Sequence, residues 1–152
     1  MRSAATRKDT LMKTQMLVLL LQFAGILHIG LAWAGATMPR AVRLRSHLES
    51  LPPFPRRLFL VYFAFVGLVL VGFGTLTFFF AGAMAAGEPV ARALCVLCLV
   101  FWTARLFVAS FIFDVRPYLT NWFYRLGYQA TNLVFVYLVG VYALAVWKGG
   151  AL

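Results

Sequence analysis

The chain has 152 residues, of which 63% are hydrophobic and 12% are charged, and its formal net charge is +10. A soluble domain is typically about 45–50% apolar and about 25% charged, so this chain could not cover its surface with polar groups in water. Its basic residues cluster in the N-terminal tail and between apolar runs, which favours anionic phospholipid headgroups over nucleic acid as partners. We therefore expect an integral protein of the cell (inner) membrane.

Four apolar runs lie at residues 14–36, 58–86, 90–113 and 128–147. Each is long enough for a membrane helix of about 20 residues. A helix satisfies its own backbone hydrogen bonds in lipid, and these runs are too long and continuous for the strands of a barrel. The sequence predicts an all-α fold, a four-helix membrane bundle with short loops that forms a single domain over residues 1–152.

The first run has a second interpretation as a secretory signal peptide. Basic residues precede it, and Ala32, Trp33 and Ala34 resemble a small-residue cleavage site. Met12 is an alternative start of the chain, because it opens a short basic and then apolar segment. We keep the run as a membrane span.

The segment after the first run carries its own pattern. In residues 40–51, RAVRLRSHLESL, the apolar positions recur at helical spacing and the basic residues lie mostly elsewhere around the helix. This pattern predicts a short interfacial helix on anionic headgroups, and an extended basic loop is the alternative. The residues expected to contact lipid headgroups here and at the start of the next run are Arg40, Arg43, Arg45, Arg56 and Arg57.

Two ionisable side chains, His28 and Arg105, lie well inside the predicted spans. An arginine at the bilayer centre costs about 2.5–3.5 kcal/mol on insertion scales, so such residues usually face a partner or a cavity. Both lie about two-thirds of the way along parallel helices, and we expect Tyr62 and Asn132 to reach the same depth from the antiparallel helices. The sequence thus predicts one intramembrane site formed by these four residues, with a quinone, a tetrapyrrole pigment or a lipid as its ligand.

Small residues surround His28 on its helix face: Ala24, Gly25, Ala32 and Gly35. They leave room for a closely packed helix or for a flat ligand. An alanine four residues before the histidine resembles the chlorophyll-binding helix of light-harvesting polypeptides. A first-helix histidine followed by Trp and Gly resembles the small four-helix haem proteins of the protoporphyrinogen oxidase type. These one-helix resemblances imply axial ligation by His28; a structural hydrogen-bonding histidine and a quinone contact are the alternatives.

The segment CVLCLVFWTAR places Cys95, Cys98, Trp102 and Arg105 on one helical stripe. The Cys-x-x-Cys resembles the motif of the DsbB family, membrane enzymes that form disulfides at the expense of quinone. That resemblance implies a reversible disulfide with a quinone headgroup near the arginine. The chain departs from the family, because it has no other cysteine and its motif lies inside the third run rather than at the start of the second. We interpret the cysteines as packing residues, with the redox role as the alternative.

These features together predict the class of protein. The sequence has no soluble domain, no carboxylate pair in a span, no nucleotide-binding loop and no metal-binding cluster. We expect a non-catalytic accessory subunit of a larger membrane complex, with energy-transducing complexes as the commonest setting. The alternatives are a thiol–quinone oxidoreductase that uses Cys95 and Cys98, and a small transporter. Proton-coupled transport is disfavoured because no acidic residue lies deep in a span.

Overall fold

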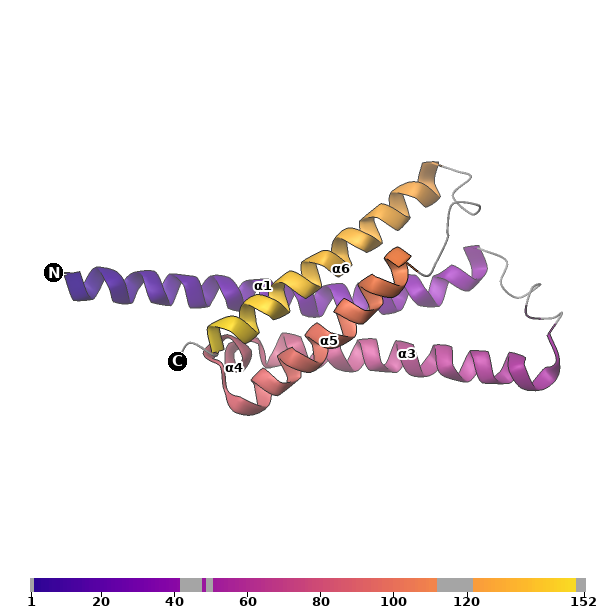
Figure 1. Cartoon of the computed structure of the whole chain (residues 1–152), viewed down its shortest axis with the longest axis horizontal. Helices are drawn as coiled ribbons and strands as arrows, with labels where there is room; N and C mark the ends of the chain where they lie inside the picture. The colour runs from indigo at the N-terminus through magenta and orange to yellow at the C-terminus, as the bar shows by residue number, and fades with distance from the viewer. Residues whose placement is uncertain (1, 42–47, 49–50, 112–121, 150–152) are drawn as a thin grey trace.

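The protein is built almost entirely of helices (Figure 1). The computed structural model describes residues 2–41, 48, 51–111 and 122–149. Within these ranges it contains the helices α1 (Arg2–Ala41), α3 (Pro53–Phe79), α4 (Ala81–Ala86), α5 (Pro89–Phe111) and α6 (Trp122–Gly149), and no strand.

Four of the helices are long and apolar enough to cross a membrane. The candidate spans have mean hydropathies between 1.8 and 2.3 and cover Leu11–Thr37, Pro53–Phe79, Pro89–Phe111 and Arg125–Lys148. The predicted all-α, four-helix membrane bundle is confirmed, and the chain has the architecture of a multi-pass membrane protein.

The second apolar run differs from its prediction. We expected one helix over residues 58–86, and this is wrong: α3 ends at Phe79 and a separate short helix, α4, follows. The break lies at Phe80, whose φ of −99° and ψ of 16° leave the helical region. The change of direction allows the buried side of α4 to pack against α1 and α6.

Gly87 ends α4. Its φ of 75° is left-handed, a conformation that glycine adopts without steric cost. The amides of Gly87 and Glu88 then donate to the carbonyls of Met84 and Ala83, at 3.2 and 3.1 Å. The chain thereby turns into α5 within a few residues.

Most of the predicted interfacial helix at 40–51 lies outside the described residues. Residues 40 and 41 belong to the end of α1 rather than to a separate helix. Leu48 is buried, and its carbonyl accepts a bond from the Leu51 amide at 3.2 Å. The prediction therefore stays a prediction over the rest of the segment.

The helices form two antiparallel hairpins. α1 packs mainly against α3, and α5 packs mainly against α6, as Figure 1 shows, with the second hairpin inclined to the first. α1 and α3 approach closely at Gly25 and Gly74, where a Cβ on either residue would lie 2.8 Å from the carbonyl oxygen of the other. Small residues that permit such close approach are typical of helix packing in membranes.

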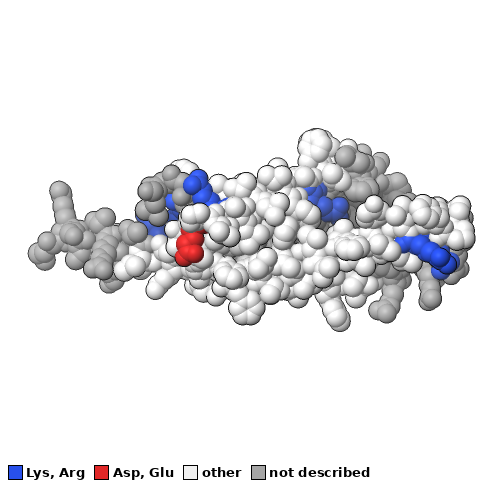
Figure 2. All heavy atoms as spheres, turned by 90° about the horizontal axis from the view of Figure 1, so that it is seen from below, with Lys and Arg blue, Asp and Glu red and all other residues white. Residues whose placement is uncertain are grey.

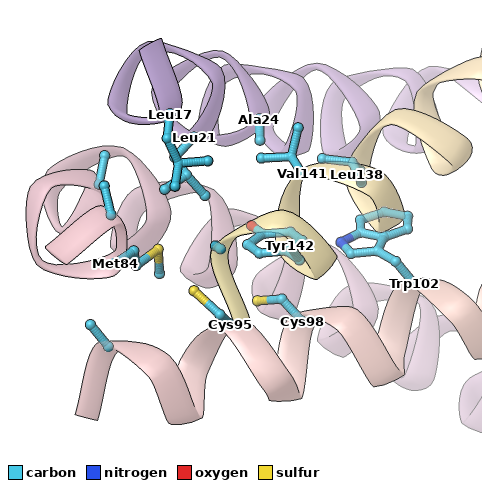
Figure 3. Close-up of a cluster of buried hydrophobic side chains, with 14 of the residues drawn as sticks. Leu17, Leu21, Ala24, Met84, Cys95, Cys98, Trp102, Leu138, Val141 and Tyr142 are labelled. Carbon is cyan, nitrogen blue, oxygen red and sulfur yellow. The ribbon is translucent and has the colours of Figure 1, made fainter. Parts of the chain in front are cut away.

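The core lies between α1, α4, α5 and α6. Its buried side chains include Leu21 of α1, Met84 of α4, Trp102 of α5 and Leu138 of α6 (Figure 3). α3 is peripheral, since its buried residues are only Gly74 and Thr77. Most of its apolar side chains remain exposed, as expected for a helix that faces lipid or another protein.

Candidate functional site

Polar and sulfur-containing side chains meet at the centre of the bundle. We call this group the buried polar cluster; each member is at most 2% exposed, and its residues are His28, Thr77, Cys95, Cys98, Trp102 and Tyr142. They come from α1, α3, α5 and α6, so the cluster joins both hairpins. Figure 3 shows the two cysteines, Trp102 and Tyr142 gathered between α5 and α6.

His28 uses both of its ring nitrogens. Nδ1 lies 2.7 Å from the carbonyl oxygen of Ala24, and the indole N–H of Trp102 donates to Nε2 at 2.8 Å. A carbonyl only accepts and an indole N–H only donates, so Nδ1 carries the proton and Nε2 is the acceptor. The imidazole is therefore neutral. A metal could bind Nε2 only after Trp102 had moved away.

Three aromatic rings pack against the imidazole. The rings of Phe73, Trp102 and Tyr142 meet it edge to face, with centroids 6.4, 5.1 and 6.0 Å away. The space beside Gly25 that a flat ligand would need is occupied by α3, through Gly74 and Phe78. The geometry is that of a structural, hydrogen-bonding histidine, one of the alternatives left open by the sequence.

The hydroxyls in the cluster also bond to one another. Thr77 Oγ1 and Tyr142 Oη lie 2.7 Å apart, within hydrogen-bond distance. Among the described residues, no buried side-chain nitrogen or oxygen lacks a hydrogen-bond partner. A fully satisfied network of this kind stabilises one arrangement of the helices, because each group would lose its partner in another.

No protein-family model, curated protein or solved structure matches this chain. Its chemistry therefore has to follow from its own residues. In the part of the chain that the structure describes, no group of three His, Cys, Asp or Glu side chains is placed to hold a metal ion.

The structure separates the four residues of the predicted ligand site. Tyr62 is 64% exposed and precedes Gly74, which contacts His28, by twelve residues on α3. At about 1.5 Å per residue, it lies roughly 18 Å from His28 along the helix axis. Tyr62 and His28 are therefore not brought together.

Arg105 and Asn132 remain near one another but apart from His28. Arg105 is exposed, and its Cζ lies 5.8 Å from the ring centroid of Phe135. Asn132 is half-buried and precedes Phe135 by nearly one turn of α6. The Trp102 ring packs against Phe135, with centroids 5.2 Å apart, and its indole N–H donates to His28. Phe135 and Trp102 therefore separate Arg105 from His28.

The burial of the predicted stripe on α5 therefore differs between its two ends. Cys95 and Cys98 are free thiols that are completely buried, and Trp102 follows them into the core, whereas Arg105 is exposed. Sequence reasoning missed Trp102 as the partner of His28, although both lie at one depth on parallel helices. It also missed Thr77 and Tyr142, because nothing in the sequence indicated which faces of their helices point inward.

Two of the arginines expected to contact lipid lie within the described residues. Arg56 is half-buried and Arg57 is exposed, and both line an open hollow at the start of α3. Its other lining residues are Leu51, Pro53 and Leu60, so charged and apolar side chains share it. The structure does not describe the side chains of the remaining three arginines, Arg40, Arg43 and Arg45.

Proposed function

We propose that this chain is a non-catalytic membrane protein that serves as an accessory subunit of a larger complex in the cell membrane. One observation carries the proposal: Arg105, a charged side chain inside a span, is exposed on the outside of the bundle. Charged residues in membrane spans almost always face the bundle interior or a water-filled cavity. Because Arg105 faces outward within its span, we expect another molecule to cover this side chain.

The interior of the bundle supports a structural rather than a catalytic role. Both nitrogens of His28 are engaged, and the hydroxyls of Thr77 and Tyr142 bond to each other. Thiol–disulfide exchange requires access to a thiolate, whereas Cys95 and Cys98 are 0% exposed. The burial of both thiols therefore favours the structural role over the thiol–quinone alternative.

Anionic phospholipids are the second kind of partner that we propose. The hollow at the start of α3 offers two arginines beside apolar side chains, a combination that suits a phosphate with its acyl chains. Figure 2 shows basic side chains toward both ends of the molecule and also part-way along it, on a surface that is mostly uncharged in that view. Contacts of this kind would place the ends of the helices at the headgroups.

Native purification tests the proposal. A chain tagged at its C-terminus is extracted from its own membranes in mild detergent, and co-eluting proteins are quantified by mass spectrometry against a tagged, unrelated membrane protein. We expect at least one other integral membrane protein in stoichiometric amount, in an assembly larger than the 17.0 kDa of the chain. Elution as a monomer with lipid alone would contradict the proposal, and so would quinone reduction by the purified chain at the expense of a thiol.

A further inference from the structure

Arg105 lies inside its span, toward the end of α5. It precedes Phe111, the last described residue of α5, by six residues, or roughly 9 Å of helix. The α5 span has a mean hydropathy of 2.1, and exposed apolar residues such as Val100 and Phe107 flank the arginine on either side. The guanidinium is therefore set in a hydrocarbon-facing surface, where a lone charge is costly.

The Arg105 side chain packs on α6. Two contacts join α5 and α6 on either side of it: the hydroxyl of Tyr128 donates to the Ala109 carbonyl at 3.3 Å, and Trp102 packs on Phe135. The Cζ of Arg105 lies 5.8 Å from the Phe135 ring centroid.

The contact with Phe135 holds the charge without neutralising it. A guanidinium over an aromatic face gains a modest cation–π attraction. Its N–H groups stay available, since within the described part of the chain Arg105 has no hydrogen-bond or ion-pair partner. The Phe135 ring thus contacts the guanidinium without supplying a hydrogen-bond acceptor.

No acidic residue of the chain lies within the four candidate spans. The chain's four acidic residues are Asp9, Glu49, Glu88 and Asp114. Glu88 precedes Arg105 by seventeen residues, or roughly 25 Å of helix, at the opposite end of α5. Glu88 of a second copy in the same orientation would therefore lie too far along the helix to pair with Arg105.

We infer that the face of α5 and α6 around Arg105 and Phe135 docks a membrane helix of a different protein, and that this helix carries an Asp or Glu within its span. A carboxylate can accept two parallel hydrogen bonds from a guanidinium, and a low dielectric strengthens the attraction. The inference rests on the proposed function, because it names the chemistry of the partner subunit. Exposed apolar residues beside the arginine, including Leu133 and Val136 of α6, would pack against the same helix.

The test uses the native complex. Arg105→Gln and Arg105→Leu are compared with Arg92→Gln, which removes an exposed arginine near the start of the same helix. Loss of one member of a buried charge pair typically weakens binding by roughly 30-fold or more, so both Arg105 variants should lose the partner while Arg92→Gln retains it. The thermal stability of the isolated chain should be unchanged in Arg105→Gln, which separates lost docking from misfolding.

Two further measurements identify the occupant. A photo-crosslinking residue in place of Leu133 should attach to a partner helix that contains an Asp or Glu. Arg105→Glu should abolish assembly, and exchange of that acidic residue for Arg should restore it. Attachment to phospholipid or to a second copy would overturn the inference, and so would equal loss of partner in Asp114→Asn. If a partner co-purifies with the wild-type chain and Arg105→Gln retains it, only this inference fails; if none co-purifies, the proposed function fails as well.

Discussion

Replacing Gly74 by alanine should destabilise the bundle at the close contact between α1 and α3. A Cβ at this position would lie 2.8 Å from the Gly25 carbonyl oxygen, 2.9 Å from His28 Cβ and 3.0 Å from Ile29 Cδ1. The first two atoms belong to the backbone and the base of a side chain, so neither can rotate away. Ordinary contact begins at 3.4 Å, so the helices must separate by about 0.6 Å, the difference between 2.8 and 3.4 Å.

That separation sets the size of the effect. A radial gap of about 0.5–1 Å forfeits roughly a quarter to a half of the dispersion attraction between the atoms concerned. Overpacking of a filled interior typically costs about 1–3 kcal/mol. The His28 ring cannot relieve the clash by moving, because hydrogen bonds hold both of its nitrogens. We therefore expect Gly74→Ala to lower the free energy of unfolding by about 2 kcal/mol, the middle of that range.

Gly72 provides the matched control. It lies on the same helix two residues earlier, and a Cβ there would meet nothing within 4 Å. Alanine is the better helix former by about 1 kcal/mol in aqueous hosts, so Gly72→Ala should be neutral or slightly stabilising. Unfolding in mixed micelles with increasing SDS, followed by tryptophan fluorescence, measures both variants. Equal free energies for the two alanine variants would refute the packing argument.

Three other predictions concern the cluster and the lipid contact. Trp102→Phe keeps a ring but leaves Nε2 of His28 buried without a donor, so unfolding free energy should fall by about 1–3 kcal/mol. Trp147→Phe, at a position 76% exposed, should have less than about 0.5 kcal/mol of effect in the same assay, and similar losses in both would contradict the reasoning. The two buried thiols of α5 should resist a membrane-permeant maleimide until the protein is unfolded, whereas rapid labelling of the folded protein would show that the cluster opens. Joint replacement of Arg56 and Arg57 by Gln should reduce retention of anionic relative to zwitterionic phospholipid in native mass spectrometry, and an unchanged ratio would place the headgroup contact elsewhere.

Hydrophobic length was enough to predict the four spans. Predominantly apolar runs of about twenty residues or more admit one structure in lipid, because only a helix pairs its backbone groups without neighbouring segments. The place of His28 and Trp102 within their apolar runs also indicated how deep in the membrane each residue lies. The break at Phe80 was not, because the small and apolar residues that follow it are compatible with either a continuous or a broken helix.

The direction in which each side chain points was decided by the tertiary structure. In water, a polar stripe shows which face of a helix lies outward, but lipid tails are as apolar as the core, so that signal is absent in a membrane. His28 therefore lies inside and Arg105 outside for reasons the sequence pattern does not contain. The close approach of Gly25 to Gly74 sets the position of α3 against α1. The packing of α5 on α6 then brings the Trp102 indole to His28. It leaves Arg105, nearly one turn further along α5, exposed beside Phe135.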